Sequence, residues 1–431
     1  MPAFPIISWM SKNLQHIKSW FKKGFFAILD QGLFGTANFL VNILLARWLE
    51  PDQYGAFAVA YSVFLLLAAF HTAVLTEPMM IFGAGKYATE FRKYIGILIY
   101  GHWITTGIIA IILGLTALVF WKVGSNSMAQ TIAGLAVASP FIVLMWFARR
   151  VFYVCFRPYW PCAGSALYFV LMILAVFLLS RAELLSPSSA LITMGVAGLV
   201  PSVGLLLVLH PRLRFTDGNP TPTMVLNDHW EYGRWNILAT GVFWASGQIH
   251  MIFVPIFLGL HTAAVIAAVL NLFRPLNLLM QSATLLVLPA LASLASKKAS
   301  QVLLRHKAKR LIILFAGAAF LYGILITGFA DFILHYLYAG KYDGYGILVF
   351  LFTLGYTASA STQILTMVLK STGNTRSVVF IWGISALIVT VMSIPMMMLW
   401  GVNGAILVVV VSYFVAASAA WKKVKLMEAS P

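Results

Sequence analysis

The sequence predicts an all-α polytopic membrane protein with twelve transmembrane helices in two six-helix lobes. Hydrophobic residues make up 61% of the 431 residues and charged residues only 10%, whereas a soluble domain is about half apolar and a quarter charged. The apolar runs last twenty residues or more, which is the length of a membrane-spanning helix and about twice that of a barrel strand. Basic residues concentrate in alternate connections, and this pattern orients the chain.

Twelve apolar runs are long enough to cross a bilayer. A stretch rich in Pro, Asp, Asn and Thr at 210–233 predicts a linker between two halves of six spans each. We therefore expect an interfacial amphipathic lead-in at 1–26, a first lobe at 27–209, a second lobe at 234–421 and a basic tail at 422–431. The predicted spans are 27–48, 54–82, 94–120, 130–154, 161–180, 188–209, 234–258, 262–291, 310–330, 345–369, 377–399 and 402–421.

The basic residues test this arrangement. If the amino terminus lies inside, 24 of the 29 Lys and Arg residues fall in segments that face the cytosol. Such a bias is typical of cytoplasmic loops, so we expect both termini in the cytosol. The formal net charge of +17 then reflects orientation against an anionic inner leaflet, and nucleic acid is not an expected partner.

Arg274 is the deepest charge in the predicted bundle. It stands about 12 residues into the span 262–291, which is roughly 18 Å of helix rise and close to the midplane. An arginine there is costly unless it faces water, an anion or a partner, and the following Pro275 predicts a kink. It is either a cationic group in a central cavity that binds a phosphate-bearing or acidic substrate, or one half of a structural pair between lobes.

Two acids and a histidine are candidates for ion coupling or gating. Asp30 and Glu77 lie towards the inner ends of adjacent antiparallel spans, and His71 stands six residues before Glu77. These groups could respond to H⁺ or Na⁺ as a coupling ion. Alternatively, basic neighbours such as Arg149 or Arg150 satisfy the acids, and the histidine packs through a hydrogen bond.

Further candidates lie at the inner mouth and on the first span. Arg149 and Arg150, followed by Arg157, anchor the orientation of spans four and five, and they could also capture a lipid pyrophosphate. Asn38 and Asn42 stand on a face of small and amide residues, which either lines a cavity or packs closely against another helix.

The sequence lacks several common signatures of enzymes. The stretch Gly83–Lys86 lacks the spacing of a phosphate-binding loop, and neither His-Glu-x-x-His nor Gly-x-Ser-x-Gly occurs. The sequence predicts no catalytic residue, no metal site and no cofactor other than the coupling ion.

Several short motifs carry a resemblance to a known family. They stand in the first hairpin, at the end of the second span, and after the fourth and tenth spans: Asp30-Gln31-Gly32, Asn38-Phe39, Leu44-Leu45-Ala46-Arg47, Tyr54-Gly55-Ala56-Phe57, Glu77-Pro78-Met79, Arg149-Arg150-Val151-Phe152-Tyr153 and Lys370-Ser371-Thr372-Gly373-Asn374-Thr375. In these motifs the chain resembles polysaccharide exporters, the O-antigen-type lipid-linked oligosaccharide flippases of the multidrug/oligosaccharidyl-lipid/polysaccharide (MOP) exporter superfamily.

The resemblance implies a bacterial cytoplasmic-membrane flippase that moves an undecaprenyl-pyrophosphate-linked glycan outwards by alternating access. Its expected partners are the glycan, membrane lipids and the polysaccharide or lipopolysaccharide assembly machinery. A multidrug/cation antiporter of the same superfamily is the first alternative, but it should hold deep acids, whereas the deep charge here is basic. A membrane-embedded saccharide ligase or polymerase is the second, and the short outer loops argue against it.

Overall fold

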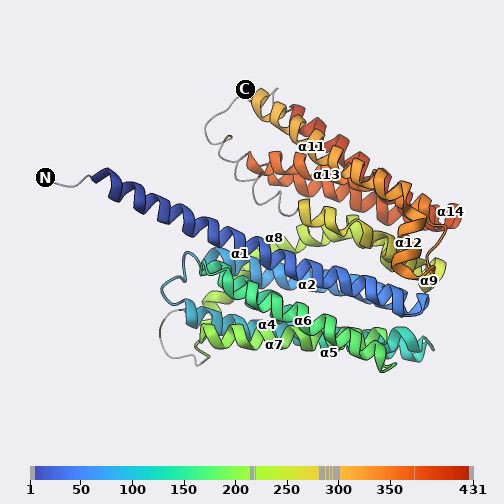
Figure 1. Cartoon of the computed structure of the whole chain (residues 1–431), viewed down its shortest axis with the longest axis horizontal. Coiled ribbons are helices and arrows are strands. Elements are labelled where there is room, and N and C mark those ends of the chain that lie inside the picture. Colours follow the sequence, from blue (N-terminus) through green and yellow to red (C-terminus); the bar gives the residue numbers. More distant parts are fainter. Residues whose placement is uncertain are drawn as a thin grey trace.

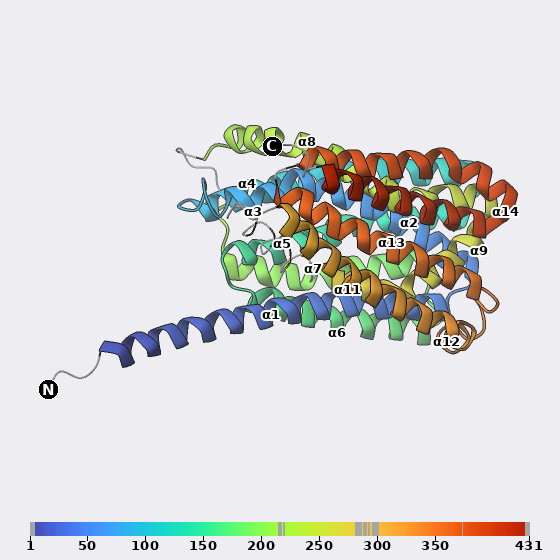
Figure 2. The same ribbon diagram turned by 90° about the horizontal axis from the view of Figure 1, so that it is seen from above.

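The computed structural model describes residues 5–213, 218, 220–280, 287, 291, 294, 301–372 and 374–426. Figures 1 and 2 show that its long helices run side by side in a bundle. The first lobe holds α1 (Pro5–Trp48), α2 (Pro51–His71), the π-helix η1 (Thr72–Thr76), α3 (Glu77–Phe82), α4 (Phe91–Lys122), α5 (Asn126–Val154), α6 (Tyr159–Arg181) and α7 (Pro187–Leu209). The second lobe holds α8 (Pro222–Gln248), α9 (His250–Leu272), α11 (Gln301–Gly328), α12 (Ala330–Tyr338), α13 (Gly346–Ser371) and α14 (Thr375–Leu426).

The prediction of twelve spans is confirmed within these residues. Ten helical runs are long and apolar enough to cross a membrane, and two of them are 51 residues long. One of these contains the predicted eleventh and twelfth spans, and the other contains the seventh span and the first part of the eighth. The chain turns between the paired spans at Gly259 (φ 83°) and at Gly401 (φ 57°). Both angles lie in the left-handed region, which glycine adopts without steric cost. The eighth span is described continuously only as far as residue 280.

The amino-terminal segment is continuous with the first span. The predicted lead-in, described from residue 5, runs into that span without a break, so α1 is one continuous helix of 44 residues that projects beyond the bundle (Figures 1 and 2). The helix has no breaker, because no proline follows Pro5 until Pro51. The interfacial position of the lead-in stays a prediction. At about 1.5 Å per residue, α1 is roughly twice as long as a membrane core is thick.

Two connections also contain helix. The second half of the predicted linker 210–233 belongs to α8, which begins with Thr221 as a cap and Pro222 in its first turn. Pro at the first helical position and a Thr cap are both strong start signals. The longest outer connection contains α12, which ends where Ala339 takes a left-handed conformation (φ 54°).

The two lobes meet along α2, which packs against α8 and α9. Gly55 of α2 lies against the backbone of Leu260, where an added Cβ would come within 1.9 Å of the carbonyl oxygen. Deeper in the bundle, the Trp244 indole donates to the Ser62 carbonyl oxygen at 3.2 Å. In Figure 1 the lobes converge near α9 and α12 and diverge towards the end from which α1 projects. We call the end at Trp48 the outer end and the opposite one the inner end, following the predicted orientation.

Candidate functional site

Arg274 lies where the helix after α9 restarts. Helix α9 ends at Leu272, Phe273 forms a turn, and helix resumes at 274–280. Pro275 has no N–H to continue the hydrogen-bond ladder, which explains the break that the sequence predicts. The Arg274 guanidinium donates through Nη2 to Oδ1 of Asn42 at 3.1 Å. This contact crosses from the second lobe to α1 of the first.

The amide face of α1 lines this contact. Asn42 is buried and donates to the Asn38 carbonyl at 2.8 Å, and Tyr168 of α6 donates to the Asn38 side chain at 3.3 Å. One turn further in, Gly35 faces Leu278, whose Cδ2 would lie 2.9 Å from an added Cβ. The small face of α1 therefore packs closely at Gly35 and presents an amide to Arg274 at Asn42. That this face lines a cavity stays a prediction.

Arg274 meets α1 in the outer half of that helix. Asn42 stands six residues before the end of α1 at Trp48, which is about 9 Å of helix rise. The long arginine side chain reaches this helix from the segment after α9. The position of Arg274 near the membrane midplane stays a prediction.

The surroundings of Arg274 are polar but uncharged. Tyr54, Tyr61, Tyr338 and Tyr356 are near enough to interact with it electrostatically. Among the residues that the structure describes, no carboxylate lies within ion-pair distance of this guanidinium. Within the described part of the chain, the Asn42 amide is therefore its hydrogen-bond partner, phenols lie nearby, and no carboxylate neutralises its positive charge.

Asp30 and Arg149 form a buried ion pair within the first lobe. Arg149 donates to Asp30 through Nε at 3.1 Å and through Nη2 at 2.7 Å, and its guanidinium stacks over the Phe34 ring at 4.1 Å. Tyr153 and Ser165 donate to the same carboxylate. The ion pair joins α1 to α5, and the Ser165 hydroxyl joins α1 to α6. Arg149 is thus no exposed anchor at the inner mouth, and Asp30 has little capacity left for a cation in this conformation.

Glu77 and Arg150 lie on the side of the first lobe that faces α8. Asn236 of α8 donates to Glu77. Arg150 is half-buried and close enough to Glu77 and to His71 for electrostatic interaction. Glu77 follows η1 directly, so a local irregularity of the helix separates it from His71.

His71 forms a pair that sequence reasoning did not anticipate. Its Nε2 lies 3.0 Å from Nδ1 of His102 on α4, and both rings are buried beside Phe147. The sequence held one signal for this pairing. The two histidines stand at similar distances from the loop that joins their antiparallel spans.

Two basic residues close the outer end of the bundle. Arg47 of α1 donates to the Tyr336 carbonyl of α12 at 2.8 Å, and Lys341 donates to the Leu49 carbonyl at 2.7 Å. Both bonds join one lobe to the other. We call these two contacts the outer latch, and sequence reasoning treated their donors only as exceptions to the charge bias.

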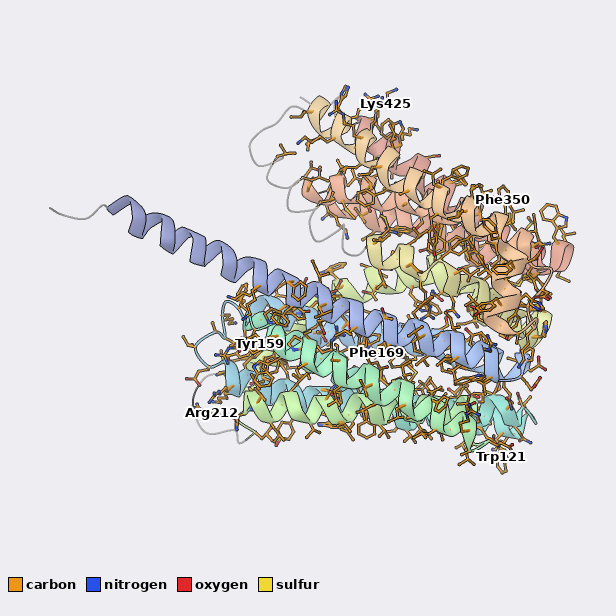
Figure 3. The ribbon with its side chains drawn as sticks, in the orientation of Figure 1. Trp121, Tyr159, Phe169, Arg212, Phe350 and Lys425 are labelled. Carbon is orange, nitrogen blue, oxygen red and sulfur yellow. The ribbon has the colours of Figure 1, made fainter. Side chains whose placement is uncertain are left out.

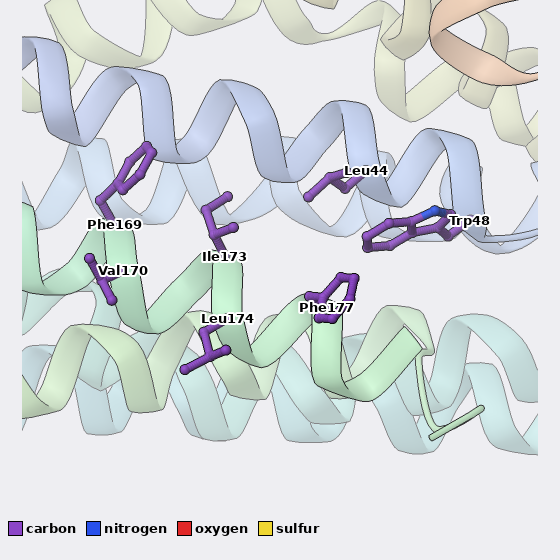
Figure 4. A pocket seen from close by; sticks show the side chains of 7 residues that line it. All are labelled: Leu44, Trp48, Phe169, Val170, Ile173, Leu174 and Phe177. Carbon is purple, nitrogen blue, oxygen red and sulfur yellow. The ribbon is translucent and has the colours of Figure 1, made fainter. Parts of the chain in front are cut away.

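An apolar groove of about 590 Å³ lies between α1 and α6, apart from these polar groups (Figure 4). Its lining is aliphatic and aromatic: Leu44, Trp48, Phe169, Val170, Ile173, Leu174 and Phe177. Such a surface suits a hydrocarbon chain and offers nothing to hold a charged group.

Neither a family model nor a curated protein matches this sequence. Solved structures do match. A lipid II flippase MurJ in an inward closed conformation aligns with a TM-score of 0.72 at 12% identity, over 94% of this chain and 87% of that one. The chain has the MOP-superfamily fold. An inward-facing multidrug resistance MATE family transporter aligns with a TM-score of 0.72 at 14% identity, over 93% of this chain and 94% of that one.

A third MOP-fold structure comes from Pyrococcus furiosus and aligns with a TM-score of 0.61 at 12% identity, over 96% of both chains. It is described as having a binding pocket of reverse polarity that suggests a different function. These neighbours are transporters, and their low identities establish the fold alone. The expected architecture of a MOP-like, multi-pass membrane protein is thereby confirmed.

Proposed function

We propose that this MOP-fold protein is an alternating-access exporter of an anionic lipid-linked oligosaccharide. The cargo would be a glycan on an undecaprenyl-pyrophosphate-type carrier, moved across a bacterial cytoplasmic membrane for polysaccharide or lipopolysaccharide synthesis. The observation that carries this proposal is Arg274, a cation that contacts both lobes and has no carboxylate partner among the described residues. The similarity in fold to a lipid II flippase supports it.

The charge of Arg274 gives a physical reason for an anionic cargo. A guanidinium presents parallel N–H donors that match the oxygens of a phosphate group, and such charge-assisted bonds are strong where water is scarce. The contact with the Asn42 amide is neutral and can be exchanged for a phosphate without separating two opposite charges. Asn38 and Asn42 are the neighbouring donors and acceptors that would orient the headgroup.

Movement between lobes requires contacts that can break. The outer latch uses exposed or half-buried side chains on backbone carbonyls, so its opening costs only about 1–2 kcal/mol. The seam of α2 with α9 is the more extensive interlobe contact, and it too would have to shift before the outer end opens. Binding of cargo to one conformation more tightly than to the other would then set the direction of transport.

Glu77, His71 and Arg150 are the groups that we assign to gating or ion coupling. They gather around η1, beside the middle of α8, so a change in the protonation of Glu77 or His71 would act on the lobe seam. Asp30 is assigned a positioning role, because Arg149 and two hydroxyl groups already satisfy it. The coupling ion would be H⁺ or Na⁺.

The second candidate function is multidrug/cation antiport, which the similarity in fold to MATE family transporters favours. A cation carrier needs a carboxylate that can release its partner and hold the cargo. Asp30 is the acid best placed for that task, and its bidentate contact with Arg149 speaks against it.

The test is to replace Arg274 with alanine and with lysine in the strain that produces the protein. We expect Arg274→Ala to stop surface polysaccharide export and to accumulate lipid-linked glycan, while the protein remains in the membrane. Lysine keeps the charge and should restore part of the export. Arg181→Ala, an exposed arginine at the same end, is the matched control and should export normally. Normal export by the Arg274→Ala variant, together with dye efflux by the wild type, would favour the antiporter.

A further inference from the structure

A small pocket opens at the inner end of the first lobe, between α4, α5 and α7. Its volume is about 250 Å³. It lies away from Arg274, which is reached from α1 and the helix after α9. Figure 3 shows Arg212 and Tyr159, two neighbours in this region, at the opposite end of the lobe from Trp121. The lining residues are Phe91, Arg92, Phe152, Cys155, Arg157, Val208 and Leu209.

The wall of the pocket carries two positive charges. Arg92 and Arg157 are exposed, and within the described ranges neither has a carboxylate in ion-pair contact. Glu90, the acid nearest in sequence to Arg92, is paired instead with Arg212 at 3.5 Å. Burial raises the pKa of the Cys155 thiol, although the charge of Arg157 acts the other way, so the thiol adds no negative charge.

The floor of the pocket is apolar and rigid. Phe152 and Leu209 are buried in the core that joins α4, α5 and α7. Arg157 is brought beside them by the turn that ends α5, in which Phe156 takes a left-handed conformation (φ 54°) and the Arg157 N–H bonds to the Phe152 carbonyl at 3.0 Å. Residues other than glycine disfavour this left-handed conformation. Contacts with neighbouring residues must therefore hold Phe156 in it.

The rim of the pocket has the aromatic composition that is typical of a membrane surface. Phe156 and Tyr159 are exposed aromatic residues beside the two arginines. Aromatic side chains favour the interface between lipid and water, where headgroups lie. A pocket with cationic walls, an apolar floor and an aromatic rim matches a molecule that has a phosphate group joined to a hydrocarbon chain.

We propose that this pocket binds the phosphate headgroup of an anionic glycerophospholipid from the inner leaflet. Arg92 and Arg157 hold the phosphate group, and the first carbons of an acyl chain lie over Phe152, Val208 and Leu209. This lipid is a resident of the first lobe and is distinct from the transported cargo. The proposal does not depend on the transport function, since it concerns binding to the purified protein.

The experiment is native mass spectrometry of the full chain in detergent, titrated with phosphatidylglycerol or with phosphatidylcholine. We expect preferential binding of phosphatidylglycerol by the wild type. The Arg92→Ala/Arg157→Ala variant should lose about 30-fold in that affinity, since each basic residue near a membrane surface is worth about fivefold. Arg212→Ala removes a neighbouring charge from outside the pocket and should change the affinity by less than twofold.

Two further measurements distinguish a site for a lipid headgroup from a site for free phosphate. Val208→Trp fills the apolar floor and leaves both arginines in place, so it should abolish lipid binding without lowering thermal stability. Inorganic phosphate at millimolar concentration should compete only weakly with phosphatidylglycerol. The proposal is wrong if the double variant binds phosphatidylglycerol as the wild type does, or if Arg212→Ala has an equal effect. If inorganic phosphate displaces the lipid fully, the site is one for free phosphate. If Val208→Trp leaves lipid binding intact, the acyl chain does not lie over the pocket floor and the proposal is wrong.

Discussion

Replacing Arg149 with alanine would leave the buried carboxylate of Asp30 without its cation. Asp30 is fully buried and Arg149 nearly so, and two N–H groups of the guanidinium reach the carboxylate at 3.1 and 2.7 Å. Among the residues that the structure describes, the hydroxyl groups of Tyr153 and Ser165 would remain as its donors from other helices. The variant therefore tests whether this pair holds α1 against α5 and α6.

The expected loss of stability follows from the burial. Removing one partner of a buried ion pair costs about 3–5 kcal/mol, because the other charge stays in a medium of low dielectric constant. The loss of the stacking contact with Phe34 acts in the same direction. Replacing both partners, in Asp30→Asn/Arg149→Met, removes both charges together, and we expect it to recover at least half of that loss.

The assay is reversible unfolding of the purified protein in mixed detergent micelles, followed by the fluorescence of its tryptophans. Arg157→Ala is the control, since this exposed arginine two turns further on should change the free energy of unfolding by less than about 0.5 kcal/mol. A cost below 1 kcal/mol for Arg149→Ala, or a double variant less stable than Arg149→Ala, would refute the assignment of the pair to positioning.

Two other predictions concern the contacts between the lobes. The Arg47→Ala/Lys341→Ala variant removes the outer latch, which contributes about 1–2 kcal/mol, and should increase the outward-open population severalfold. Spin-label distances across the outer end measure this, and an unchanged distribution would show that the latch does not hold that end closed. Gly55→Ala forces a Cβ against the Leu260 carbonyl and should cost about 1–3 kcal/mol in the same unfolding assay. Gly107→Ala, whose added Cβ meets no atom within 4 Å, is its control, and equal stability of the two variants would contradict the close packing.

The sequence predicts the spans well because their signal is local. A run of twenty apolar residues must cross the membrane as a helix, whatever the neighbouring helices do. The twelve spans follow from this rule, and Gly259 and Gly401 mark two of the turns between them. The start of α8 inside the predicted linker was not recognised, because polar composition was interpreted as a break in helix. Its backbone signal, Thr221-Pro222, pointed to the start of a helix.

The candidate site was predicted only in part, because its contacts depend on how each helix is rotated. Arg274 stands out in any sequence of this composition, and the kink at Pro275 is a local property. The pairing of Asp30 with Arg149 was one of several open possibilities, since Arg150 was an equal candidate by sequence. The His71–His102 pair joins residues 31 positions apart, and the similar distances of the two histidines from their shared loop permit this contact without specifying it. The outer latch joins residues still farther apart in the sequence, and no local pattern reports such contacts.

The most direct test of the central claim is the affinity of purified protein for an undecaprenyl-pyrophosphate-linked glycan, compared between the wild type and Arg274→Ala. Loss of a charge-assisted contact with a desolvated phosphate group costs about 2–3 kcal/mol, which corresponds to a 30- to 150-fold weaker affinity. We expect Arg274→Lys to retain part of the affinity and Arg181→Ala to retain all of it. An Arg274→Ala protein that binds the glycan carrier within twofold of the wild type would contradict the account.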